Sequence, residues 1–153
     1  MKKGLLLMTS VLLMTGCGAV ETEFAEGTYV GSAIDTYGGV ENVSTADLAI
    51  DADGNITSIY LDTTYTIDNV GTTKKSLGDE YGMKSLSETL GEIEGGAEWY
   101  EQVAALEAAI IENQGTDFLI LTEDGKTDAV SGCTISIDSL VEATNAALEE
   151  ARN

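Results

Sequence analysis

Alternating apolar and polar positions dominate the first part of the chain after residue 26. The segment GTYVGSAIDTY, residues 27–37, alternates between two sets of side chains, and residues 43–67 contain two arms rich in Val, Ile, Thr and Tyr. The arms are joined by ADGN, residues 52–55, and Asp-Gly is a strong hairpin signal. The pattern therefore predicts three antiparallel strands. In the second arm both sets contain apolar residues, so the pattern leaves open which set faces the core.

Apolar residues recur at helical spacing in two later segments, residues 97–113 and about 138–152. Their expected core-facing residues are Trp99, Val103, Leu106 and Ile110 in the first, and Leu140, Val141, Thr144 and Leu148 in the second. Gly115 is the expected stop of the first helix, and Ser136 or Asp138 the expected N-cap of the second. The run DFLIL, residues 117–121, fits a buried strand or a helical turn, and we favour the strand.

These elements predict a single domain of the α+β class over residues 27–153. A small antiparallel sheet, with its hairpins in the N-terminal half, packs with two or three helices. A chain of 153 residues favours one domain and is long enough to bury a core.

The N-terminus has the features of an export signal. Two lysines precede an apolar run that is too short to span a bilayer comfortably, and small residues follow. Residues 14–17, MTGC, resemble the bacterial lipobox, which implies cleavage after residue 16 and lipidation of Cys17. Residues 17–26 would then form the lipidated N-terminus and a tether on the outer face of the cytoplasmic membrane. The alternative is a simple secretory signal that contains a cysteine.

Charge and composition exclude several classes of function. The chain has 27 acidic and seven basic residues, and removal of residues 1–16 takes away Lys2 and Lys3, so the mature net charge is 5 − 27 = −22. Such a charge repels phosphates and argues against nucleic-acid partners. The absence of histidine excludes Ser-His-Asp and Cys-His catalysis and histidine metal ligands.

The stretch DAVSGCT, residues 128–134, is the strongest candidate for chemistry. A helix is expected a few residues later, and a helix N-terminus favours a phosphate. Gly132 allows a sharp turn and close approach, and Thr134 offers a hydroxyl. With no histidine in the chain, a separate enzyme would have to activate that hydroxyl. Taken alone, these residues favour a plain loop and N-cap.

This stretch resembles the flavinylation motif of the FMN-binding domain family. Asp128, Ser131, Gly132 and Thr134 match the motif, and Cys133 stands where alanine is usual. The resemblance extends over about residues 27–151, including GTYVGSA, DGNITSI, TKKSLGDEYGMK and the two helical segments. It implies that a flavin transferase attaches FMN to Thr134 through a phosphoester bond.

The same resemblance implies an electron carrier similar to the surface flavin lipoproteins of Gram-positive bacteria and to flavinylated subunits of Rnf-type and sodium-pumping complexes. Electrons would pass from a membrane donor to an extracellular acceptor or a partner reductase. The alternatives are a reductase component with a specific acceptor, a protein that holds FMN without a covalent bond, and a ligand-binding or adhesive lipoprotein without cofactor.

Four further residues are candidates for flavin contact. Trp99 or Met83 would stack on the isoalloxazine ring, although Trp99 also fits a core position on its helix. Lys74 and Lys75 would pair with the flavin phosphate or stabilise reduced, anionic flavin, although a lysine pair is more often solvated surface.

Overall fold

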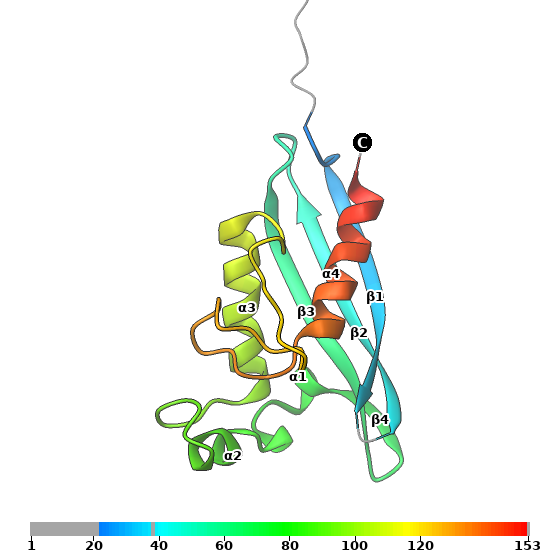
Figure 1. Ribbon diagram of the computed structural model, residues 1–153. Helices are drawn as coiled ribbons and strands as arrows, with labels where there is room; N and C mark the ends of the chain where they lie inside the picture. Colours follow the sequence, from blue (N-terminus) through cyan, green and yellow to red (C-terminus); the bar gives the residue numbers. More distant parts are fainter. Residues whose placement is uncertain (1–21, 38, 153) are drawn as a thin grey trace, which may run out of the picture.

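Four antiparallel strands form the sheet in the computed structural model, which describes residues 22–37 and 39–152. They are β1 (Gly27–Tyr37), β2 (Val40–Ile50), β3 (Ile56–Ile67) and β4 (Val70–Thr73), in spatial order β1-β2-β3-β4 (Figure 1). The three expected strands are present, and short β4 is a fourth that the pattern did not predict.

The β2–β3 hairpin resolves the open question of which side chains face the core. Ile59, Leu61 and Thr63 are buried on the inner face of β3. Ile56 is also buried, although it is separated from Ile59 by an odd number of positions and simple alternation would turn it to the other face. The pairing with β2 shifts register between Ala49 and Ile50, and this shift returns Ile56 to the inner face. This bulge explains why no single alternation fits the whole arm.

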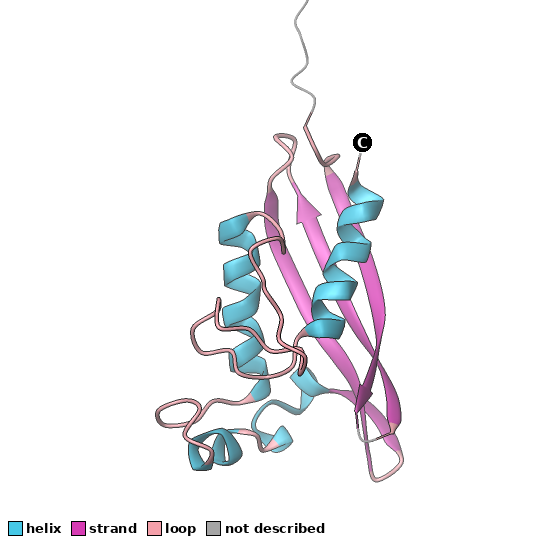
Figure 2. Ribbon diagram, in the orientation of Figure 1, coloured by secondary structure: helices cyan, strands magenta, loops and turns pink. Residues whose placement is uncertain are grey.

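The described part of the chain has two long helices, and three short ones follow β4. The two long helices cover one face of the sheet (Figure 2). In chain order, the helices are α1 (Lys74–Leu77), η1 (Gly78–Tyr81), α2 (Lys84–Thr89), α3 (Trp99–Asn113) and α4 (Asp138–Ala151). Helix α3 packs against β3, and α4 crosses β1 and β2. The backbones of β1 and α4 approach so closely at Gly31 that an added Cβ would lie 1.9 Å from the Ala143 carbonyl oxygen. The arrangement confirms the α+β class.

The segment between α3 and α4 differs from the prediction. Residues 117–121 form a turn and irregular backbone rather than a strand, and Ile120 is 83 % exposed. The Leu119 N–H donates to the Thr116 carbonyl in a tight turn, so the run does not extend along a neighbouring strand. Helix α3 ends at Asn113, and its C-cap is Gln114 in a left-handed conformation, directly before the expected stop at Gly115.

The N-cap of α4 was also predicted wrongly. Ile137 occupies that position and makes no side-chain capping bond, while the Ser136 hydroxyl donates to the carboxylate of Asp138. Ile137 is fully buried and its N–H donates to the Gly125 carbonyl. Apolar burial and a backbone contact therefore decide where this helix begins.

The two described ends of the chain lie together. Phe24 is 7 % exposed and forms an antiparallel bridge with Arg152. The packed domain therefore begins at least three residues before the expected boundary at Gly27, within the segment expected to be a tether. The expected signal peptide and Cys17 lie outside the described residues. Within the described ranges, no helix is both long and apolar enough to cross a membrane.

Candidate functional site

A cavity of about 290 Å³ opens where the first turns of α3 and α4 meet α2 and the end of β1. Its lining residues are Asp35, Thr63, Lys74, Tyr81, Met83, Leu86, Ser87, Leu90, Glu92, Trp99, Gln102, Lys126, Thr134, Ile135, Ser136, Ser139 and Leu140. They come from segments far apart in the sequence. The volume is close to the lower bound of about 300 Å³ for small-molecule sites, which suits a planar group with part of the ligand in solvent.

Thr134 lies at the mouth of this cavity and is held by one buried side chain. The Gln102 carboxamide oxygen accepts a hydrogen bond from the Thr134 N–H at 2.9 Å and lies 3.1 Å from its hydroxyl. Gln102 is fully buried on α3, and its amide nitrogen lies 3.4 Å from the Ala97 carbonyl. The turn before α4 is thus fastened to the first turn of α3 at the residue that bears the hydroxyl.

A carboxylate and an ammonium group complete the environment of that hydroxyl. Glu92 Oε2 lies 3.2 Å from Thr134 Oγ1, and Glu92 Oε1 lies 3.1 Å from Lys126 Nζ. The hydrogen bond from Lys126, with a smaller contribution from Thr134, lowers the pKa of Glu92, so the carboxylate is ionised at neutral pH. One carboxylate therefore contacts both the Lys126 ammonium group and the Thr134 hydroxyl.

Aromatic and aliphatic side chains form the middle of the cavity. Tyr81 and Trp99 meet edge to face at a centroid distance of 6.5 Å, and Tyr65 extends this row with an edge contact to Tyr81 at 5.3 Å. Leu86 and Leu90 on and after α2 line the cavity and remain more than half exposed. Such a surface accommodates the face of a planar aromatic ring.

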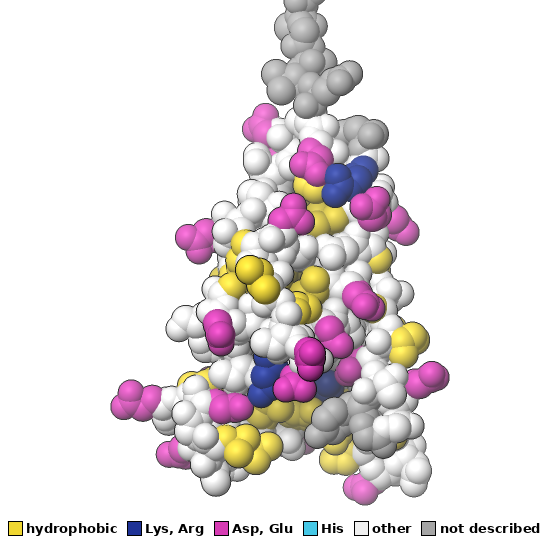
Figure 3. All heavy atoms as spheres, in the orientation of Figure 1, with side chains coloured by type: hydrophobic (Ala, Val, Ile, Leu, Met, Phe, Trp, Pro, Cys, Tyr) yellow, Lys and Arg dark blue, Asp and Glu magenta, His cyan; other side chains and the backbone are white. Residues whose placement is uncertain are grey.

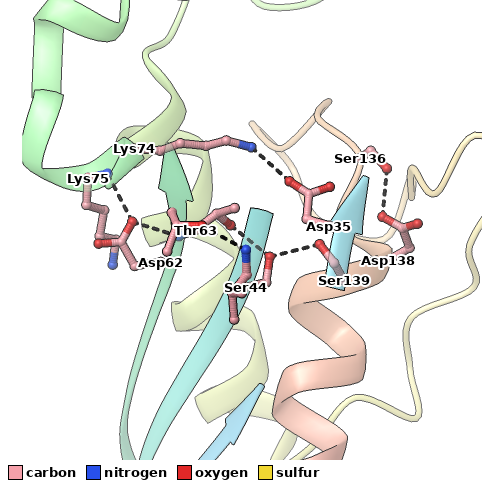
Figure 4. Close-up of polar contacts among 11 residues, drawn as sticks. Asp35, Ser44, Asp62, Thr63, Lys74, Lys75, Ser136, Asp138 and Ser139 are labelled. Carbon is pink, nitrogen blue, oxygen red and sulfur yellow. Dashed lines mark hydrogen bonds and ion pairs between the residues drawn. The ribbon is translucent and has the colours of Figure 1, made fainter. Parts of the chain in front are cut away.

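One end of the cavity, formed by residues of β1, β3, α1 and α4, is polar. Lys74 pairs with Asp35 at 3.3 Å and lies 5.3 Å from the centre of the Trp99 ring (Figure 4). Thr63 and Ser139 both line the cavity, and the buried Ser44 hydroxyl joins them with contacts of 2.8 and 2.9 Å. This end offers a positive charge and hydroxyl groups to a polar ligand edge.

The other motif residues lie outside the cavity. Asp128, Ser131 and Gly132 are exposed, and Gly132 has a left-handed φ of 81°. Cys133 points the opposite way, into the core, where it is 3 % exposed and burial raises the pKa of its thiol to about 11. The thiol is therefore protonated at neutral pH, and Cys133 is not among the residues that line the cavity.

Of the four additional candidates, three line the cavity and one does not. Trp99, Met83 and Lys74 are lining residues. Lys75 lies in a separate surface groove, where it pairs with Glu107 and sits 3.9 Å from the centre of the Tyr60 ring. The structure thus separates the two neighbouring lysines. Trp99 is also a buried core residue, so both interpretations of that side chain hold together.

Several residues that complete the site were missed from the sequence. One indication of Gln102 was present in the sequence. This residue lies three positions after Trp99 on the apolar face of α3, where a polar residue is unexpected. Glu92 and Lys126 carried none, because they belong to irregular segments that are 34 residues apart.

The surface around the cavity is acidic. Figure 3 shows Asp and Glu side chains spread over this face, with Lys and Arg in few places. This distribution agrees with the net charge of −20. A free dianionic phosphate would be repelled by this surface, whereas a covalent bond or a local cation would retain it.

The comparison with known families gives one match. Residues 37–149 match the family model described as the FMN-binding domain. Searches among curated proteins and among solved structures gave no significant match. The matched range includes Thr134 and most of the residues that line the cavity.

Proposed function

Because the chain belongs to the FMN-binding domain family, we propose that it carries FMN on Thr134 through a phosphoester bond and works as an electron carrier. The observation that supports this most directly is the position of Thr134. Among the five residues that match or replace the flavinylation motif, Thr134 alone lines the cavity. Ser131, the other hydroxyl of the motif, is exposed on the outside of the turn.

The lining residues fit FMN in three zones. Thr134 and Lys126 would hold the phosphate, while Trp99, Tyr81 and Met83, which also line the cavity, would supply apolar contacts for the ring. Lys74 and the hydroxyls of Thr63 and Ser139 supply polar partners for the ring's oxygen- and nitrogen-bearing edge. When bound, FMN supplies one- and two-electron redox chemistry, and the protein supplies position and shielding.

Attachment requires an activated donor, because a phosphate monoester does not condense with an alcohol unaided in water. A flavin dinucleotide meets this need in a reaction catalysed by a transferase. The bond between Thr134 Oγ1 and the FMN phosphorus forms, and the phosphoanhydride bond breaks. The leaving nucleoside monophosphate takes the bonding electron pair, and the threonine proton passes to solvent or to a base of the transferase. The exposed Asp128, Ser131 and Gly132 are accessible for recognition by that enzyme.

Lipidation at Cys17 would hold this carrier on the outer face of the cytoplasmic membrane. Electrons would then pass from a membrane donor to an extracellular acceptor or a partner reductase. The open cavity mouth, with its exposed Leu86 and Leu90, supports exchange with a partner by close approach rather than turnover of a buried substrate.

Intact mass under denaturing conditions tests the proposal. The chain is produced with and without a flavin transferase and magnesium, and Thr134→Val is produced alongside. We expect the wild type to gain the mass of one FMN minus one water and Thr134→Val to gain nothing. Thr134→Ser, which keeps a hydroxyl, should recover part of the loading. Circular dichroism of the valine variant verifies that it is folded.

The remaining outcomes separate the alternatives. A yellow protein that becomes colourless and unmodified on denaturation would indicate FMN held without a covalent bond. A colourless, unmodified wild type would contradict the electron carrier and favour a ligand-binding or adhesive protein.

A further inference from the structure

The contacts of Glu92 conflict with a phosphate on Thr134. One carboxylate oxygen lies 3.2 Å from Thr134 Oγ1 and the other lies 3.1 Å from Lys126 Nζ. A phosphorus atom bonded to Oγ1 would bring its own charged oxygens into the space beside the carboxylate. Two anions in such close contact repel each other, and solvent moderates the repulsion because Lys126 and Glu92 are 43 % and 33 % exposed.

Lys126 is the cation that this arrangement leaves for the phosphate. Among the described residues that line the cavity, Lys74 and Lys126 are the basic ones. Lys74 is already paired with Asp35 and lies over the Trp99 ring. Lys126 is 43 % exposed, and the Glu92 carboxylate contacts both its ammonium group and the Thr134 hydroxyl.

We propose that Glu92 occupies the phosphate subsite in the unmodified protein and that Lys126 transfers its ion pair from Glu92 to the phosphodiester on attachment. This inference rests on the proposed attachment at Thr134. Before modification, the Glu92 carboxylate holds the Lys126 ammonium group close to the Thr134 hydroxyl. During attachment, the same carboxylate repels the incoming phosphate. Lys126 is thus a positioning residue for the attached cofactor.

The backbone around Glu92 can accommodate this exchange. Glu92 follows Gly91 in the loop between α2 and α3, and Gly91 has a left-handed φ of 67°. The side chain of Glu92 is 33 % exposed, so it can turn to solvent when the phosphate takes its place. This rotation would break the two contacts of the Glu92 carboxylate, those with Lys126 and Thr134, and neither contact is buried.

The test follows loading by purified transferase with a flavin dinucleotide and magnesium, using intact mass against time. The variants are Glu92→Gln and Lys126→Met. Their matched controls are Glu94→Gln, an exposed acid of the same loop, and Lys84→Met, an exposed lysine at the start of α2. We expect Glu92→Gln to load about threefold faster and Lys126→Met about threefold more slowly, as for a partly exposed ion pair, with both controls unchanged.

The ³¹P chemical shift of the loaded proteins separates a contact with the phosphate from an effect on the transferase. Lys126→Met should shift the phosphodiester resonance, whereas Glu92→Gln should leave it unchanged because Glu92 has already turned away. A resonance in Lys126→Met identical to that of the wild type would overturn the inference, even if loading is slow. A wild type that never gains FMN would overturn both the proposed function and this inference. A wild type that gains FMN, with variants that load at the same rate and give the same resonance, would overturn only the inference.

Discussion

The scaffold and the cavity wall of this protein are stabilised in different ways. The scaffold consists of β1, β2, β3, α3 and α4, and the cavity wall consists of residues 74–98 and 114–137. In the scaffold, apolar side chains repeat at the period of the strand or helix and fill one core. In the wall, individual polar side chains form hydrogen bonds with backbone groups that have no partner in a helix or a sheet.

Glu98 shows how the wall is stabilised. Its buried carboxylate accepts hydrogen bonds from the N–H groups of Met83 at 2.8 Å and Lys84 at 3.1 Å, which fixes the start of α2. The Ser87 hydroxyl similarly bonds to the N–H and the carbonyl of Ala97. Substitutions in the scaffold should therefore change global stability, whereas those in the wall should loosen the cavity locally.

The largest expected effect is in the scaffold. Leu61 is fully buried in β3, and Leu61→Ala should lower the free energy of unfolding by about 3 to 4 kcal/mol through lost burial and a residual cavity. Urea denaturation followed by circular dichroism measures this. Ile34→Ala, on the exposed face of β1, is the control and should cost about 0.5 kcal/mol or less. Similar losses in both variants would contradict the distinction between the two sheet faces.

The second prediction concerns the point where the wall enters the core. Burial raises the pKa of the Cys133 thiol from an ordinary 9.0 to about 11, so the folded state holds this proton more tightly than the unfolded state. The resulting stability is complete below pH 9 and falls as pH rises toward 11, by about 2 to 3 kcal/mol in total. Urea titrations at several pH values measure the fall.

Cys133→Ala isolates this contribution. Tyr60 and Tyr100 also have raised pKa values, from burial and from a hydrogen bond to Asp79 respectively, and both remain in the variant. The alanine variant should therefore lose less stability over the same pH range than the wild type. Equal losses would mean that the thiol is accessible to water in the folded protein.

The smallest expected global effect is in the wall. Glu98→Gln keeps the shape of the side chain but leaves one acceptor where there were two, so one N–H of Met83 or Lys84 loses its partner. Hydrogen exchange at these two amides should accelerate about tenfold, while the free energy of unfolding changes by less than about 1 kcal/mol. Glu112→Gln, on the exposed side of α3, should change neither quantity. A large global loss in Glu98→Gln would show that wall and scaffold unfold together.

The same difference explains how much could be predicted from the sequence. The strands and α3 and α4 were predictable because burial repeats along them, as in the stripe from Trp99 to Ile110. Thr134 was predictable only by resemblance to the flavinylation motif. The strand expected at residues 117–121 was wrong because a short apolar run contains no information about its partner.

The polar half of the site could not be predicted, since it depends on contacts between irregular segments. Glu92, Lys126 and Thr134 meet only because two loops converge on the first turns of α3 and α4. No period marks such residues, and their types are common on acidic surfaces. Lys74 and Lys75 are neighbours with the same side chain, yet the backbone turn at the start of α1 sends one into the cavity and the other to Glu107.

The bridge between Phe24 and Arg152 brings both described ends to one pole of the molecule, whereas Asp35 lines the cavity near the other end of β1 (Figure 1). A strand rises about 3.3 Å per residue, so the eight steps of β1 from Gly27 to Asp35 span about 26 Å. A fusion partner at either end would therefore leave the cavity mouth clear. A circular permutant that joins the two ends by a short linker and opens the chain at the exposed ADGN bend should keep both the sheet order and access to Thr134.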